Sequence, residues 1–220
     1  MNIKTKRIIM SVFGMSILGV VVALLRKANL GVDPFTSFVV GVGNIFNTTY
    51  GIMFPILTGI FLIAVFFIDK HFIGIATILN LVIIGPVADI TLKGLNLLYD
   101  ASNIWIQIVT LFIALVILCI ASALYIVGNL GVSSYDALSL ILAEKLEGKK
   151  WGQYRFCRMF TDIICVIIGF STGAVIGIGT VITAFFMGPF TQFFIIHLAK
   201  PLLYGKITET SDDLDNVKNT

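Results

Sequence analysis

Charged side chains are scarce in this sequence: Asp, Glu, Lys and Arg together make up 12% of its 220 residues. Apolar residues make up 58%, and the mean hydropathy is +1.01, which excludes an ordinary soluble domain. One membrane span needs about 20 apolar residues, and several stretches without any Asp, Glu, Lys or Arg exceed that length. We therefore expect a membrane protein whose main partner is the lipid bilayer. The uncharged stretches are residues 8–25, 34–68, 71–88, 101–135 and 163–199.

Residues that bind metals or act as nucleophiles are also few. The three cysteines, Cys119, Cys157 and Cys165, lie in apolar segments, where a thiol is usually inert. His71 and His197 have no HExxH or CxxC companion, no histidine lies near a candidate nucleophile in the chain, and no Walker A or dinucleotide-binding motif is present. These absences predict a protein that is not an enzyme and that has no metal or cofactor. The net charge of +3 is too small to indicate a nucleic-acid partner.

An internal repeat is the most informative feature that the sequence does contain. The tetrapeptide Asn-Leu-Gly-Val occurs at residues 29–32 and again at 129–132, 100 positions later. Further pairs follow in the same order, which chance does not preserve, so the sequence predicts two homologous repeats. These pairs are Ala23-Leu24 with Ala123-Leu124, Tyr50-Gly51 with Trp151-Gly152, and Thr77 before Gly85-Pro86 with Thr180 before Gly188-Pro189.

The apolar runs and the breaks between them predict an all-α polytopic membrane protein. Two segments, 35–47 and 135–147, are about 13 residues long, or roughly 20 Å of helix, against a hydrocarbon core near 30 Å. We interpret them as short broken or re-entrant helices, which leaves about six full transmembrane helices. Three spans per repeat make the repeats inverted; the alternative, in which the short segments cross, gives eight spans and parallel repeats. The full spans are predicted at 8–27, 51–68, 72–91, 104–127, 152–170 and 174–199.

The predicted organisation places residues 1–7 in a cytoplasmic N-terminus, 8–98 in the first repeat, 99–103 in a linker and 104–200 in the second repeat. The polar tail, residues 201–220, is expected to be disordered and cytoplasmic. In this topology the inner side carries about nine Lys and Arg and the outer side about three, but the eight-span alternative has the same distribution. The size of the chain is compatible with a homodimer, although no segment predicts an interface.

The densest group of ionisable residues within the apolar segments lies in the second repeat. Arg158 and Asp162 are four positions apart on one predicted helix, Arg155 shares their face, and Asp136 begins the short helix before them. An ionisable residue inside a bilayer costs about 2.5 to 3.5 kcal/mol and is a functional candidate by default. Guanidinium groups suit carboxylates and phosphates, so Arg158 with Arg155 is a candidate for binding an anionic solute. The alternatives are an internal salt bridge that pins two helices and, for Arg155, a position at the membrane interface.

The breaks after the first helix of each repeat are a second candidate site. Asn29 and Gly31 form the first break, and Asn129 and Gly131 form the second. Glycine and asparagine tolerate left-handed backbone, which ends a helix and frees carbonyl groups. Non-helical backbone at membrane depth is tolerated only where it is buried in protein or lines a wet cavity. The helices that restart there direct N-terminal amide groups inward, which suits an anion, although helix capping alone explains a residue such as Asp33.

A third candidate lies in the Gly-x-x-Thr motifs that end at Thr77 and Thr180. Small residues at this spacing favour close helix packing, and the Gly-Pro pairs that follow favour kinks. Asp89 and Gln192 each come three residues after a Gly-Pro pair. Packing is the simpler interpretation of the motifs, whereas lining a cavity is the alternative for these four polar side chains.

Several of these motifs together, over residues 8–199, resemble the YczE/YitT-type integral membrane proteins of bacteria. That family has in its second half a G-x-x-P-x-D-x-L pattern, an Arg-x-x-x-Glu pair, a G-x-G-T motif and a terminal Gly-Pro. Here Ser134 replaces the proline and Asp162 replaces the glutamate, and Thr36 stands in the first half where aspartate would be. The resemblance implies a multi-pass protein of the bacterial cytoplasmic (inner) membrane and does not supply an activity. It is carried by residues 131–138, Arg158, Asp162, residues 175–180 and Gly188-Pro189.

Duplicated membrane units are a common architecture of secondary transporters, with the binding site where the repeats meet. The sequence thus favours a secondary transporter or permease for a small anionic or zwitterionic solute. In this hypothesis Arg158 is the anion partner, and Asp136 and Asp162 are counter-charges or proton carriers. The alternative is a non-transporting scaffold or accessory protein that stabilises a partner complex.

Overall fold

The computed structural model of this protein describes residues 3–100, 103–146 and 154–204, and every regular element within these residues is helical. This confirms the predicted all-α class, which follows because a helix satisfies its backbone N–H and C=O groups within one segment, as lipid requires. The elements are α1 (Ile3–Ala28), α2 (Pro34–Ile45), α3 (Tyr50–Ile68), the 3-10 turn η1 (Lys70–Phe72), α4 (Ile75–Leu98), α5 (Ile104–Gly128), α6 (Ser134–Lys145), α7 (Tyr154–Ser171), α8 (Ile178–Phe194), the π-helical turn η2 (Ile195–Ala199) and α9 (Lys200–Tyr204).

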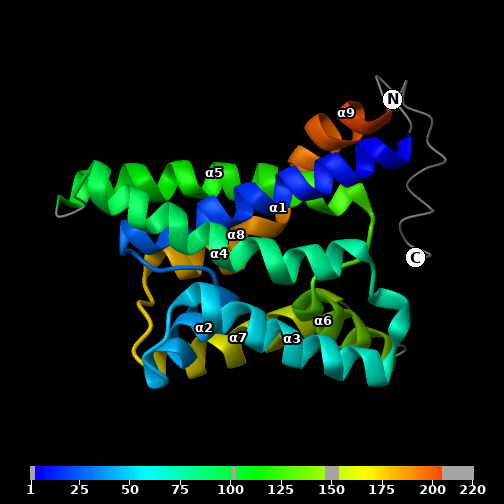
Figure 1. Ribbon diagram of the computed structural model, residues 1–220, viewed down its shortest axis with the longest axis horizontal. Helices are drawn as coiled ribbons and strands as arrows, with labels where there is room; N and C mark the ends of the chain where they lie inside the picture. The colour runs from blue at the N-terminus through cyan, green and yellow to red at the C-terminus, as the bar shows by residue number, and fades with distance from the viewer. Residues whose placement is uncertain (1–2, 101–102, 147–153, 205–220) are drawn as a thin grey trace.

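The helices pack in two layers (Figure 1). One layer contains α1, α4, α5 and α8, and the other contains α2, α3, α6 and α7. Helix α1 packs along both α4 and α5, α2 packs against α7, and α3 packs against α6. Helices from the first and second halves of the chain therefore interleave instead of forming two separate bundles. Helices α1 and α5 lie side by side and run in opposite directions, as the colours in Figure 1 show.

Among the described residues, four helices are long and apolar enough to cross a membrane: α1, α3, α4 and α5. A fifth candidate is α8 with its continuation, which bends by 55° between Ile178–Phe185 and Phe190–Tyr204. Many large apolar side chains on these helices are exposed; Phe67, for example, is 81% exposed and Leu97 is 90% exposed. Apolar surface on this scale is favourable against lipid and unfavourable against water. The protein is therefore a multi-pass membrane protein.

The two breaks adopt the left-handed backbone that their residues predict. Asn29 and Asn129 have φ of 55° and 47°, and Gly31 and Gly131 have φ of 106° and 111°. The helices that follow, α2 and α6, are each 12 residues long. At 1.5 Å per residue each is about 18 Å long, well short of a hydrocarbon core of about 30 Å. The sequence thus located two short helices correctly.

Several predicted boundaries differ from the structure. Helix α1 begins at Ile3 instead of residue 8, and α8 begins at Ile178 instead of residue 174. The helix expected over 72–91 begins after a 3-10 turn at Ile75 and continues to Leu98. At the C-terminal end, the tail predicted to be disordered from residue 201 begins with helix α9, because Leu203 is buried against Met10 and Leu124 of the main bundle. The rest of the predicted tail, residues 205–220, lies outside the described residues, as does the side chain of Arg155.

Candidate functional site

The structure brings together three of the predicted ionisable residues, Asp136, Arg158 and Asp162, which we call the charge cluster. Helix α7 carries Arg158 and Asp162 one turn apart, and Asp136 lies in the first turn of α6. The Nη1 atom of Arg158 pairs with Oδ1 of Asp136, and its Nε atom lies 3.3 Å from Oδ1 of Asp162. The side chains of Arg158 and Asp136 are 27% and 28% exposed, so this arginine is shared between two carboxylates and still accessible.

Each carboxylate of the charge cluster has a second donor that holds it in place. The Ser133 hydroxyl caps α6 and donates to Oδ2 of Asp136 at 2.7 Å. The Tyr135 hydroxyl donates to Oδ1 of Asp162 at 2.6 Å. Hydrogen bonds to an ionised acceptor are stronger than neutral ones, so these two donors keep both carboxylates turned toward Arg158. Tyr135 was not among the site residues predicted from the sequence, although its place directly before Asp136 was a usable signal.

An aromatic stack links the charge cluster to the first half of the chain. The Arg158 guanidinium lies 4.4 Å from the centroid of the Tyr135 ring. The Tyr135 ring in turn stacks on Phe35 of α2, with ring centroids 4.5 Å apart and an interplanar angle of 17°. The start of each short helix therefore contributes to the same site.

The two breaks are held by the Gly-x-x-Thr motif of the opposite half. The Leu30 carbonyl oxygen accepts the backbone N–H of Gly179 at 2.9 Å, and the Leu130 carbonyl oxygen accepts that of Ala76 at 2.9 Å. These bonds satisfy carbonyl groups that the broken helices leave free. The crossed arrangement also explains why the halves interleave.

The two threonines of these motifs are buried at the N-termini of α4 and α8. Thr77 and Thr180 are 2% and 3% exposed, and each hydroxyl accepts the backbone N–H of the glycine three residues earlier. The Thr77 hydroxyl also donates to the Val132 carbonyl oxygen at 2.7 Å. Both threonines thus act in capping and packing at these contacts.

Gly31 and Gly131 leave no room for a side chain. A Cβ atom on Gly31 would lie 2.7 Å from both the Gly177 nitrogen and the Thr180 hydroxyl oxygen. A Cβ atom on Gly131 would lie 2.6 Å from the Gly74 Cα atom. With positive φ as well, both positions require glycine for two independent reasons. Their role is to let the break of one half approach the helix start of the other.

Asp89 belongs to a separate polar site, which contains an arginine that was not among the predicted site residues. Oδ1 of Asp89 lies 3.2 Å from Nη1 of Arg26, and Oδ2 accepts the backbone N–H of Gly51 at 2.9 Å. The Arg26 guanidinium also lies 5.4 Å from the centroid of the Tyr50 ring. Gln192, which occupies the corresponding place after the second Gly-Pro pair, is exposed. The two positions therefore have different surroundings.

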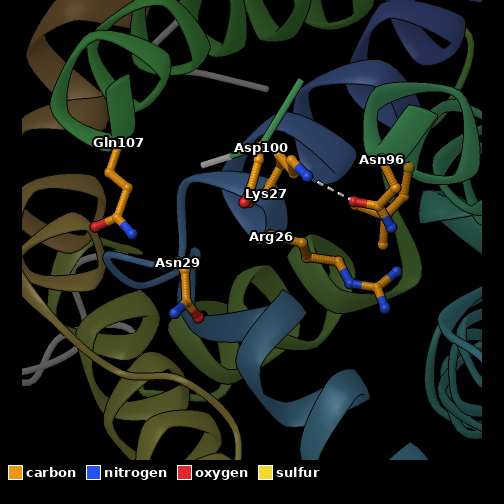
Figure 2. A pocket seen from close by; sticks show the side chains of 7 residues that line it. Arg26, Lys27, Asn29, Asn96, Asp100 and Gln107 are labelled. Carbon is orange, nitrogen blue, oxygen red and sulfur yellow. Dashed lines mark hydrogen bonds between the residues drawn. The ribbon is translucent and has the colours of Figure 1, made fainter. Parts of the chain in front are cut away.

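Asn29 lies apart from the charge cluster and lines an open hollow of about 450 Å³, which we call the polar hollow (Figure 2). Asn129, in the second break, is exposed. Within the described part of the chain, no group of three or more His, Cys, Asp or Glu side chains is arranged to hold a metal ion. The polar hollow is lined by Arg26, Lys27, Asn29, Leu92, Asn96, Asp100 and Gln107.

Comparison with known proteins places the chain among proteins without an assigned activity. Residues 5–196 match a family of unknown function, DUF6198. An uncharacterized protein of Haemophilus influenzae is 28% identical over 200 residues, which cover 89% of this chain and 86% of that protein. No solved structure matches the chain.

Proposed function

The chain belongs to DUF6198, a family of unknown function, and we propose that it is a secondary transporter or permease for a small anionic or zwitterionic solute. We place it in the bacterial inner membrane with both termini in the cytoplasm, where the positive-inside rule puts most of its Lys and Arg. Its substrate site is the charge cluster.

The observation that carries this proposal is the accessible guanidinium of Arg158 between two carboxylates. Charged groups within apolar segments are costly, and three of them meet here on helices α6 and α7. A guanidinium can bind a carboxylate or phosphate through two parallel hydrogen bonds. When no solute is bound, Asp136 and Asp162 balance the charge of Arg158. An entering anionic group replaces one of them, and the released carboxylate becomes free to take up a proton or to bind the ammonium group of a zwitterion.

Inverted repeats are the second element of the proposal. Phe35 and Tyr135 are 100 positions apart, the same spacing as the repeated tetrapeptide, and their rings stack on each other. Equivalent residues can touch only near the axis that relates two repeats, so we place that axis between these rings, beside Arg158. The opposite directions of α1 and α5 and the crossed contacts of the two breaks favour the same arrangement.

On this arrangement α7 and the bent α8 join α1, α3, α4 and α5 as six full spans, and α2 and α6 are half-depth helices. Transport then requires one half to rock against the other around a fixed site, as in other inverted-repeat transporters. In this mechanism the two halves rotate about the crossed backbone contacts at Leu30 and Leu130.

A ligand screen with a matched variant tests this function. The purified full-length protein in detergent is exposed to a panel of anionic and zwitterionic metabolites, and the melting temperature is recorded. A ligand at 100 times its dissociation constant adds about 2.7 kcal/mol of stability, which shifts melting visibly. We expect at least one compound to stabilise the wild type but not Arg158→Ala, and to be taken up by proteoliposomes that contain the wild type.

Lys145→Ala is the control, because this lysine is an exposed cation at the end of α6. It should leave both stabilisation and uptake unchanged. Uptake that survives Arg158→Ala would exclude the assigned role of Arg158. A folded protein that takes up none of the compounds it binds would favour the scaffold hypothesis.

A further inference from the structure

We propose that the polar hollow is a second ligand site, which binds a small zwitterion of the amino-acid type through Lys27 and Asp100. The hollow lies where the end of α1, the end of α4 and the start of α5 meet, and its residues are distinct from the charge cluster. Its volume of about 450 Å³ falls within the range of small-molecule sites in proteins, about 300 to 1,000 Å³. This site goes beyond the proposed function, because binding in it does not require Arg158.

The two cations of the polar hollow have different surroundings. Arg26 is neutralised by Asp89, which also accepts the Gly51 N–H, so this pair is complete within the protein. Lys27 has no carboxylate partner among the described residues. Its Nζ atom donates to the neutral amide oxygen of Asn96 at 2.9 Å and lies 5.3 Å from the centroid of the Tyr99 ring. Lys27 therefore lies at the hollow without an ion pair to any described residue.

The opposite charge is supplied by Asp100, which lines the same hollow and forms no ion pair with any residue that the structure describes. A cation and an anion that share a hollow without pairing to each other suit a ligand that carries both charges. The ligand's carboxylate would meet Lys27, and its ammonium group would meet Asp100. A simple anion would satisfy only Lys27 and would bring a second negative charge toward Asp100, so the pair selects for a zwitterion.

Amide side chains complete the hollow. Figure 2 shows Asn29 and Gln107 across the hollow from Lys27 and Asn96. Amides both donate and accept hydrogen bonds, so they can bind polar groups of the ligand without adding charge. The left-handed backbone of Asn29, with φ of 55°, places this residue at the hollow instead of continuing α1.

The position of Lys27 along α1 indicates the side of the membrane from which a ligand would approach. Helix α1 carries Lys4, Lys6 and Arg7 near its start and Lys27 at its end. On the orientation proposed above, Lys27 lies on the outer side, where the positive-inside rule disfavours cations. A ligand that approaches from outside would therefore meet Lys27 at the end of α1.

Titration calorimetry on the purified full-length protein tests the proposal. The probes are a panel of neutral α-amino acids, each paired with the acid that lacks its amino group and the amine that lacks its carboxylate. We expect at least one amino acid to bind while its acid and amine do not. Lys27→Gln and Asp100→Asn should each weaken that binding at least about tenfold, a loss of about 1.4 kcal/mol. Both substitutions keep hydrogen-bonding atoms in place, and unchanged melting temperatures would show that the variants are folded.

Two further variants separate this site from others. Lys93→Gln removes an exposed cation of α4 that does not line the hollow, and it should leave the affinity unchanged. Arg158→Ala should also retain the binding, even if it abolishes transport. The proposal is overturned if no amino acid binds, if the deaminated acids bind as tightly as the amino acids, or if Arg158→Ala removes the binding and Lys27→Gln does not.

Discussion

The hydroxyl of Thr77 donates a hydrogen bond of 2.7 Å to the carbonyl oxygen of Val132, across the junction of the two halves. Its counterpart Thr180 has no matching bond to Val32 within the described residues, and its hydroxyl contacts the Gly177 N–H at 3.4 Å. The two junctions thus share the backbone bonds to the Leu30 and Leu130 carbonyl oxygens, and the side-chain bond to the opposite half is formed by Thr77 and not by Thr180. This difference separates the contribution of a single hydroxyl from that of the junction as a whole.

Thr77→Val should lower the free energy of unfolding by about 1–3 kcal/mol, because the Val132 carbonyl oxygen is left without its donor. Thr180→Val, the matched control, should cost less, since it removes no bond between the halves. Chemical unfolding of both variants in the same detergent measures the difference. Equal losses would mean that the hydroxyl of Thr77 adds nothing at the junction.

Gly31→Ala and Gly131→Ala should each destabilise the protein by about 1–3 kcal/mol or more, since a non-glycine residue there has strained backbone and also collides with the opposite half. Gly94→Ala is the control, because a Cβ atom on Gly94 meets nothing within 4 Å. That substitution should be neutral or stabilising by about 0.5–1 kcal/mol. Melting temperatures and the yield of monodisperse protein report the effect. A tolerated alanine at residue 31 or 131 would show that the breaks do not need this close approach.

Arg26 and Asp89 should behave as a coupled pair. Arg26→Gln and Asp89→Asn each leave one charge without its partner at a site where both side chains are about one-fifth exposed. A double-mutant cycle should give a coupling energy of about 0.5–3 kcal/mol, so that the double variant is more stable than the sum of the single losses implies. Gln192→Ala, at the corresponding place in the second half, should have no effect. If the stability losses of the two single variants simply add, solvent screens the charges of Arg26 and Asp89 and the two side chains are not coupled.

Tyr135 should contribute through both its hydroxyl and its ring. Tyr135→Phe removes the bond to Asp162 and should cost about 0.5–1.5 kcal/mol. Tyr135→Leu also removes the stack on Phe35 and should cost about 0.5–1.5 kcal/mol more than its change in apolar area implies. Unfolding measurements on both variants separate the two effects. If the leucine variant is as stable as the phenylalanine variant, the stack does not hold α2 against α6.

Much of the architecture was predictable from local sequence patterns. The short helix expected over 35–47 is Pro34–Ile45, and its counterpart expected over 135–147 is Ser134–Lys145. Apolar runs, asparagine and glycine act on their own segment of backbone, so a segment of sequence is enough to locate a helix or a break. Arg158 and Asp162 were found in the same way, since a spacing of four residues puts two side chains on one face of a helix.

The contacts between segments depended on the folded chain. The partner of Asp89 is Arg26, the second donor to Asp162 is Tyr135, and Leu30 is bound by Gly179. Each contact joins segments that periodicity treats separately, and each arises because the two halves interleave. The polar hollow has the same origin, since three helices meet there and no single segment contains its charges. Local pattern set where the chain is helical, while packing between the halves decided which polar groups meet, because only packing determines which side chains lie close in space.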